Sequence, residues 1–140
     1  MAIADYIADT SAFSRIPFVP AIEDRLVNLM ERALLATCAV LDLEAFFSAQ
    51  NSADYEKQWN HRGAILEYID TEELHWQRAL EVQRDLAAKS MHRSVKLPDL
   101  LIAAVAESEG LTLIHYDADF EYIADITGQA IEWVVPRGSI

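Results

Sequence analysis

Short apolar runs alternate along this chain with longer stretches of helical periodicity. Residues 3–8, 34–41 and 111–116 have the length and composition of buried strands, and a weaker run of the same kind covers 131–135. Between the first two runs, apolar side chains recur at spacings of three and four residues, which predicts an amphipathic helix. Strands that alternate with helices in this way indicate an α/β domain whose central sheet is mainly parallel.

The middle of the chain is predicted to be helical. Residues 54–89 have the pattern of two helices with a break near residue 70. Pro98 opens a further helix, and Gly110 ends it, because glycine adopts the left-handed conformation at a helix end at little cost. Residues 89–96, which contain Ser, His and basic side chains, are predicted to form an exposed loop. We therefore expect a three-layer α/β/α sandwich with helices on both faces of the sheet.

The composition fits one globular domain over residues 1–140. Of the 140 residues 52% are hydrophobic, with only four Gly and four Pro, so a sizeable core is expected. No apolar run approaches the roughly 18 residues of a membrane span, and the first residues lack the features of a signal peptide. Cys38 is the single cysteine, which favours a reducing compartment. We expect a cytoplasmic protein that does not bind membranes.

The charge balance is strongly acidic. Eleven Lys and Arg face 23 Asp and Glu, which gives a net charge of −12 and argues against a general binder of nucleic acid or anionic lipid. Eight of the acids follow Lys96, in a stretch where Arg137 is the one basic residue. Carboxylates without local cationic partners must be solvated, cap helices or be neutralised by a metal ion.

Five acids fall at one edge of the predicted sheet. Asp9 ends the first strand and Asp117 the third, and Glu44 and Asp119 open the helices that follow strands. Asp99 opens a helix that can reach the same edge, which is where open parallel sheets bind ligands. Converging carboxylates repel one another unless a cation intervenes, and oxygen ligands suit Mg²⁺ or Mn²⁺. The pattern predicts metal-dependent phosphoryl chemistry.

Each acid also has a structural interpretation, since acidic residues commonly cap helices or occupy their first turn. Asp9 and Asp99 lie in strongly apolar surroundings, where an uncompensated charge is costly, and this favours a functional site. Two other acid-pocket folds fit less well. A phosphorylated receiver domain needs a late Lys, which residues 97–136 lack, and a haloacid-dehalogenase-like phosphatase needs Asp-x-Asp after the first strand.

At these positions the chain resembles the PIN-domain ribonucleases, and within them the VapC-type toxins of bacterial toxin–antitoxin pairs. The resemblance covers nearly the whole chain and lies in Asp9-Thr10-Ser11, Glu44, the Leu97-Pro98-Asp99 helix start and the strand before Asp117. It implies a PIN-like fold and a Mg²⁺- or Mn²⁺-dependent endoribonuclease that cleaves tRNA or ribosomal RNA. The residues implied as catalytic and metal-binding are Asp9, Glu44, Asp99 and Asp117, with Asp119 as a supplementary ligand. Thr10 or Ser11 would orient a metal-bound water or a phosphate oxygen, or cap the next helix.

The resemblance also implies an antitoxin partner and a homodimer. An antitoxin segment that carries Arg could pair with the carboxylates, and the apolar positions Leu26, Leu29 and Met30 are candidates for contact with it, although they fit the core equally well. The rival interpretation from another class is a catalytically inactive PIN-like module that only binds a partner.

Two features beside the acids remain open at this stage. The basic loop could touch an RNA backbone or be merely solvated, and its candidate residues are Lys89, His92, Arg93 and Lys96. His115 stands shortly before Asp117, where many relatives have a small hydroxyl residue. It could assist proton transfer or serve the structure alone.

Overall fold

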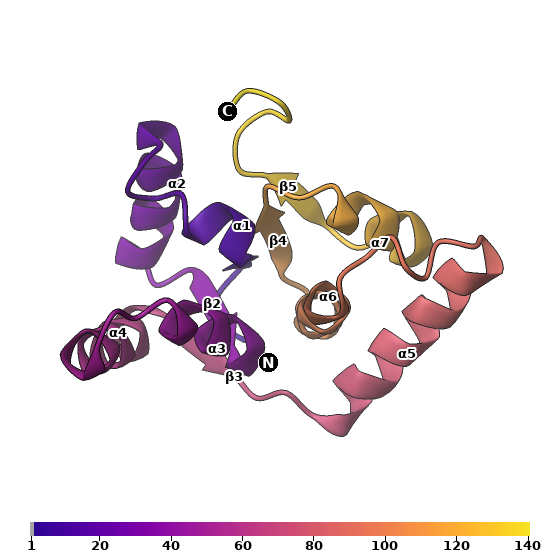
Figure 1. The fold of residues 1–140 in the computed structure, drawn as a ribbon, viewed down its shortest axis with the longest axis horizontal. Helices are drawn as coiled ribbons and strands as arrows, with labels where there is room; N and C mark the ends of the chain where they lie inside the picture. Colours follow the sequence, from indigo (N-terminus) through magenta and orange to yellow (C-terminus); the bar gives the residue numbers. More distant parts are fainter. Residues whose placement is uncertain (1) are drawn as a thin grey trace.

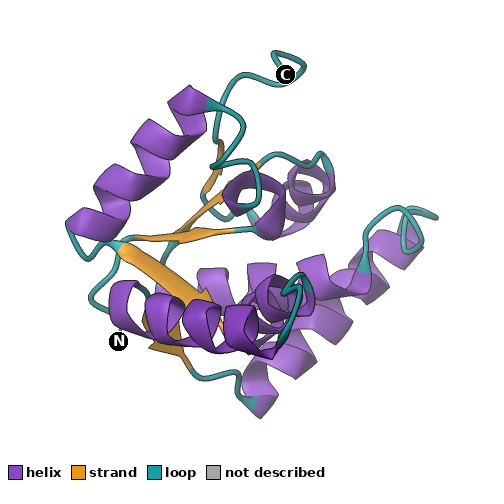
Figure 2. Cartoon of the chain, turned by 60° about the vertical axis from the view of Figure 1, so that its left-hand side comes forward, coloured by secondary structure: helices purple, strands orange, loops and turns teal. Residues whose placement is uncertain are grey.

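A computed structural model describes residues 2–140 and contains a five-stranded parallel sheet between two layers of helices (Figures 1 and 2). This arrangement confirms the expected three-layer α/β/α class. In chain order the elements are β1 (Tyr6–Ala8), α1 (Thr10–Phe13), α2 (Pro20–Glu31), β2 (Leu35–Cys38), α3 (Ala39–Phe47), α4 (Ser52–Ile65), β3 (Glu67–Ile69), α5 (Glu73–Ala88), α6 (Leu97–Glu109), β4 (Thr112–His115), α7 (Asp119–Thr127) and β5 (Ile131–Trp133).

The strands alternate their side chains between two cores. Ile7, Ala36 and Leu113 are aligned neighbours on β1, β2 and β4, and all three point into the core covered by α5, α6 and α7. Ala8 and Ile114, one position further along, pack into the opposite core beneath α1 and α2. Burial on both faces explains why the strands are continuous apolar runs without polar alternation.

The strand order places a binding edge between β1 and β4. The sheet runs β3-β2-β1-β4-β5, so the chain first builds outward from β1 on one side and then returns to its other side. In sheets of this class ligands bind outside the carboxyl ends of the strands at such a reversal. Asp9 directly follows β1, and Asp117 follows β4 by two residues, so the two acids flank the reversal.

Two predictions about the elements were wrong in detail. The apolar run 34–41 ends as a strand at Cys38, and α3 starts at Ala39, so Glu44 lies in the second turn of α3 and does not open it. A buried strand and a buried helix start are both apolar, and periodicity does not separate them. Within 54–89 the two helices and their break are confirmed, but β3 was not predicted, because a three-residue edge strand is too short to show a pattern.

The region from the basic loop to α6 agrees with the prediction. Pro98 lies in the first turn of α6, and Gly110 ends the helix with a φ of 68°. The segment between α5 and α6 is a loop whose charged side chains are exposed, while Val95 anchors it in the core. Among the helices of residues 2–140, none has the length and apolar character needed to cross a membrane.

Candidate metal centre and active site

Asp9 joins β1 to α1 and is almost completely buried. Its backbone N–H donates to the Ile114 carbonyl at 2.8 Å, and its Oδ2 accepts the Ser11 N–H at 2.9 Å. The side chain thus caps α1, as the structural interpretation proposed, and it lies at the binding edge as well. Burial raises the pKa of Asp9 above its ordinary value, since the hydrogen bonds from Ser11 only partly offset the loss of solvation.

Asp99 lies in the surroundings that are least favourable for an ionised carboxylate in this set. It lies in the first turn of α6 and its side chain is only 6% exposed. Its Oδ2 is buried and accepts no hydrogen bond. Burial, followed by the nearby charge of Asp9, raises the pKa of Asp99 to about 8. The ionised form is therefore expensive unless a cation lies beside it.

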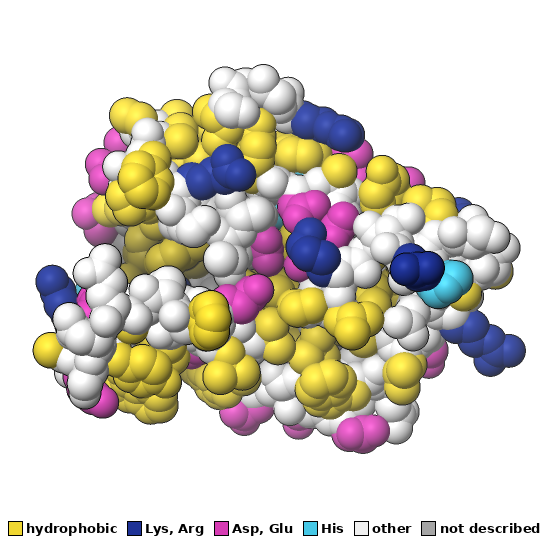
Figure 3. Space-filling view, viewed as in Figure 1, with side chains coloured by type: hydrophobic (Ala, Val, Ile, Leu, Met, Phe, Trp, Pro, Cys, Tyr) yellow, Lys and Arg dark blue, Asp and Glu magenta, His cyan; other side chains and the backbone are white. Residues whose placement is uncertain are grey.

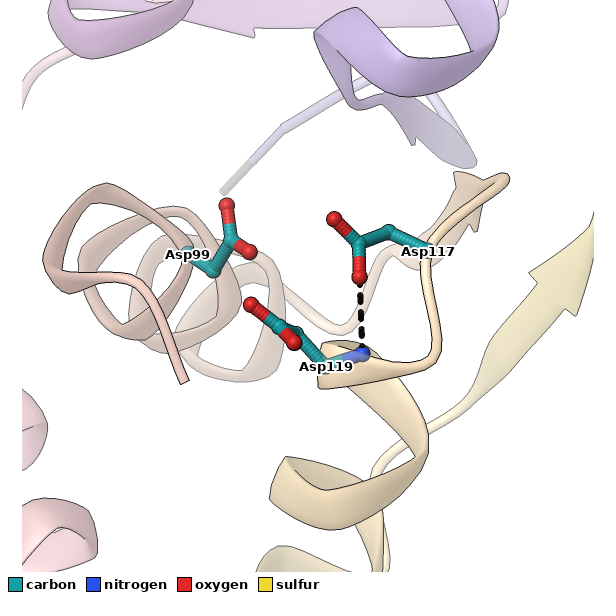
Figure 4. Close-up of side chains that lie close together, drawn as sticks. All are labelled: Asp99, Asp117 and Asp119. Carbon is teal, nitrogen blue, oxygen red and sulfur yellow. Dashed lines mark hydrogen bonds between the residues drawn. The ribbon is translucent and has the colours of Figure 1, made fainter. Parts of the chain in front are cut away.

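Asp117 and Asp119 form a tight turn that faces Asp99. The Asp119 N–H donates to Asp117 Oδ1 at 2.9 Å, and the carboxylates of both residues point toward Asp99 (Figure 4). One oxygen from each of the three aspartates lies within 4.8 Å of the others. Side chains from two segments of the chain, the start of α6 and the turn between β4 and α7, thus converge on one small volume.

Lys96 lies over this acidic turn. Its Nζ is 2.6 Å from Asp117 Oδ2, 2.8 Å from Asp119 Oδ2 and 3.4 Å from Asp99 Oδ2. The space-filling view shows a basic side chain next to several acidic ones near the middle of this face (Figure 3). Burial alone would raise the pKa of Asp119, but hydrogen bonds from the Lys96 side chain and backbone outweigh it, so that pKa is lowered.

Glu44 stands apart from the three aspartates and contacts a neighbouring hydroxyl. The Thr10 Oγ1 donates to Glu44 Oε1 at 2.9 Å, which links α1 to α3. Ser11 Oγ in turn accepts the Tyr116 N–H at 2.9 Å and ties α1 to the turn after β4. Both hydroxyls therefore hold the walls of the site, and Thr10 orients the Glu44 carboxylate.

His115 lies in the core and contacts the backbone of Asp117. Its ring is fully buried against Phe120 and Trp133, and Nδ1 accepts the Asp117 N–H at 3.1 Å. Burial lowers the pKa of His115 to about 4, so the imidazole is neutral at physiological pH. Its Nε2 is buried without a partner. These contacts favour the structural interpretation over proton transfer.

Arg15 is a neighbour of the site that the sequence analysis missed. Its Nε donates to the Ser11 carbonyl at 2.9 Å, and its guanidinium lies 4.6 Å from the centre of the Tyr116 ring. No motif marks it, because α1 itself was not expected. In the basic loop, Lys89, His92 and Arg93 are exposed, whereas the Lys96 ammonium turns inward to the acids.

The residues at this edge fit a hard divalent cation. Every converging donor is a carboxylate oxygen, and the buried Oδ2 of Asp99, which accepts no hydrogen bond, would gain a partner from a bound cation. The ammonium of Lys96 lies among the three carboxylates, where a positive charge reduces their mutual repulsion. A cation at this position could contact Asp99, Asp117 and Asp119, and Asp9 lies close enough to raise the pKa of Asp99.

Comparison with known proteins agrees with this geometry. The PIN domain family profile matches residues 6–126. Ribonuclease VapC21 of Mycobacterium tuberculosis is 49% identical over 134 residues, which cover 96% of each chain. Ribonuclease VapC51 of the same species is 42% identical over 135 residues, again 96% of each. The crystal structure of DNA-bound VapBC from Salmonella typhimurium superposes with a TM-score of 0.73 at 22% identity, and the match covers 95% of this chain and 100% of that one.

A five-stranded parallel sheet with acids at its reversal defines a PIN-type fold, and the matches in sequence and structure place the chain more narrowly. It belongs to the PIN-domain family, among the VapC-type ribonucleases.

Proposed function

We propose that this chain is a metal-dependent endoribonuclease that cleaves structured RNA, either tRNA or ribosomal RNA, and acts as the toxin of a type II toxin–antitoxin pair. The observation that carries the proposal is the convergence of Asp99, Asp117 and Asp119 beside Asp9 at the sheet reversal, with one carboxylate oxygen buried and unpartnered. Relatives that are 49% and 42% identical over nearly their full length are named ribonucleases.

In this proposal Asp9, Glu44, Asp99 and Asp117 form the catalytic and metal-binding set, and Asp119 is a supplementary ligand. A bound Mg²⁺ or Mn²⁺ would lower the pKa of a water molecule and neutralise charge on the phosphodiester. Glu44 accepts the Thr10 hydroxyl on Oε1, and its second oxygen is proposed to bind the metal ion or a metal-bound water. The buried His115 keeps the backbone of Asp117 in place.

Basic side chains near the cluster of Asp99, Asp117 and Asp119 provide the proposed contacts with RNA. Lys89, His92 and Arg93 are exposed on the loop that precedes α6, and Arg15 lies against Tyr116 next to Asp117. These contacts are few, and the net charge is −12, so affinity cannot depend on many phosphate contacts. Selectivity would depend on RNA shape and on geometry at the acids.

The proposed antitoxin would occupy a groove beside the acids. A cavity of about 420 Å³ lies between α1, α2, α3 and α4, with Thr10, Met30 and Arg62 among its lining residues. Leu26 and Leu29 belong to the core, so of the three apolar candidates only Met30 faces the groove. A partner helix in this groove would bring its polar flank close to the Thr10–Glu44 pair.

A homodimer is also proposed. Five large apolar side chains on α3 and α5 are more than half exposed, as expected for a surface that another chain covers: Leu43, Phe47, Leu74, Trp76 and Leu80. Light scattering of the purified toxin would measure its mass, and a monomer at micromolar concentration would contradict the dimer.

Cleavage of defined RNA tests the catalytic proposal. Purified chain without antitoxin, given Mg²⁺ or Mn²⁺, should cut tRNA or ribosomal RNA at discrete positions, and EDTA should abolish the cutting. Asp9→Asn and Asp99→Asn should keep the fold by circular dichroism and lose both cleavage and growth arrest. Asp85→Asn, an exposed acid on α5, is the matched control and should cleave like wild type. A wild-type protein that cuts no cellular RNA but binds its antitoxin would favour the inactive binding module.

A further inference from the structure

Lys96 makes an unusual set of contacts for an exposed lysine. Its Nζ donates to Asp117 Oδ2 and Asp119 Oδ2, and its own backbone N–H donates to Asp119 Oδ2 at 3.0 Å. Within residues 2–140 it is the one Lys or Arg that makes ion pairs with the three clustered aspartates. The cluster therefore has a cation supplied by the chain itself.

This cation satisfies the cluster incompletely. The ammonium forms hydrogen bonds with Asp117 and Asp119, but its 3.4 Å approach to Asp99 Oδ2 forms none. One unit of positive charge lies among three carboxylates, one of which is 6% exposed. A divalent ion carries twice that charge and can bind one oxygen from each of the three carboxylates. It would therefore neutralise the cluster more completely than the lysine does.

The ammonium is also able to leave. The Lys96 side chain is 62% exposed and the residue lies at the N-terminal boundary of α6, with four methylene groups between its backbone and Nζ. Rotation of the side chain into solvent would break the Nζ contacts and preserve the backbone hydrogen bond to Asp119. The turn formed by Asp117 and Asp119 could then keep its position while a divalent ion replaces the ammonium.

We propose that Lys96 is an internal counter-ion, which stabilises the acidic cluster in the metal-free protein and competes with the divalent ion for the same carboxylate oxygens. The inference rests on the metal site of the proposed function. It assigns Lys96 a role in metal binding that differs from the RNA contact expected of the basic loop.

Metal binding and metal-free stability, measured on the same variants, test this competition. Lys96→Met removes the charge and keeps much of the chain length, and Lys96→Gln provides a second neutral variant. We expect both to bind Mn²⁺ about tenfold more tightly than wild type by electron paramagnetic resonance titration. In EDTA both should melt about 3 °C lower than wild type, and added Mn²⁺ should raise their melting temperature more than it raises that of wild type.

Two controls separate competition from a general charge effect. Lys57→Met makes the same change of net charge at an exposed site on α4 and should leave Mn²⁺ affinity within about twofold of wild type. Lys96→Arg keeps the charge and should stay close to wild type in EDTA. A Lys57 variant that tightens binding as much as the Lys96 variants would overturn the inference.

The remaining outcomes distinguish this inference from the proposed function. If wild type binds Mn²⁺ and the neutral Lys96 variants bind it equally or more weakly, Lys96 does not compete and the inference fails alone. If neither wild type nor the variants bind Mn²⁺ at millimolar concentration, the metal site of the proposed function fails and the inference fails with it.

Discussion

The backbone N–H of Tyr116 donates a 2.9 Å hydrogen bond to Ser11 Oγ, and this bond joins the two segments that flank the sheet reversal. Ser11 belongs to α1, which begins directly after Asp9, and Tyr116 directly precedes Asp117. The spacing between the acids of β1 and β4 therefore depends on a side chain that need not touch substrate.

Replacement of this hydroxyl should cost both stability and activity. We expect Ser11→Ala to lose about 1 kcal/mol of unfolding free energy, because the Tyr116 N–H loses its acceptor. RNA cleavage should fall about tenfold as the two acidic segments shift. Urea unfolding and initial cleavage rates measure the two effects, with Ser48→Ala at an exposed helix end as control. Lost cleavage at unchanged stability would instead indicate that Ser11 contacts the substrate.

The raised pKa of Asp99 predicts how metal-free stability depends on pH. An unfolded Asp99 loses its proton near its ordinary pKa of 3.8, whereas the folded form keeps it up to about 8. The folded state therefore binds more protons, so this residue lowers stability as pH rises between those values, by at most about 1.4 kcal/mol per pH unit.

His115 acts in the opposite direction at lower pH. Its folded pKa of about 4 lies below the ordinary 6.5, so stability rises with pH between these values as the unfolded chain loses its imidazole proton. Above pH 6.5 the Asp99 contribution remains. We expect the metal-free protein to lose stability from pH 6.5 to 8, and Asp99→Asn to be flat over that window. Urea unfolding in EDTA measures this, and a decline of equal slope in Asp99→Asn would contradict it.

The sequence was sufficient to place most of the acids. Three of the four apolar runs are followed directly by an acid, and parallel strands carry their carboxyl ends to one edge, so the positions of Asp9 and Asp117 could be predicted from the sequence. Glu44 was misplaced by a turn, because the run that contains β2 continues as apolar helix. Its contact with Thr10 depends on how α3 packs against α1, which periodicity does not encode.

The counter-ion could not be predicted from composition. Residues 97–140 contain one basic residue, so their carboxylates were expected to lack a local cationic partner. Lys96 lies just before this stretch and 21 positions from Asp117, yet its Nζ reaches that carboxylate at 2.6 Å. The loop conformation between α5 and α6 determines this approach, and residues of a charged loop show no pattern that predicts it.

A buried ion pair outside the cluster of Asp99, Asp117 and Asp119 should contribute strongly to stability. Arg62 of α4 is 7% exposed, donates to Asp42 Oδ1 and Thr37 Oγ1 at 3.0 Å, and lies over the Phe13 ring. Arg62→Met leaves the Asp42 charge without its partner and should cost about 3 kcal/mol of unfolding free energy. Guanidinium unfolding of the purified variant measures the loss.

The double variant Arg62→Met with Asp42→Leu tests whether the two charges stabilise each other. It removes both charges, so it should be more stable than Arg62→Met alone. If the double variant is destabilised by the sum of the two single changes, the pair is not coupled as the 3.0 Å contact indicates.

The role of His115 can be resolved by its pH dependence. Because Nδ1 accepts the Asp117 N–H from within a fully buried ring, loss of the acceptor should displace Asp117 without removing a proton-transfer group. We expect His115→Leu to weaken Mn²⁺ binding about tenfold, and His115→Asn, whose Oδ1 can take the place of Nδ1, to recover part of that loss. The pH profile of the residual cleavage should keep its shape in both variants. A profile that loses one limb in both variants would show instead that the imidazole carries a proton during the reaction.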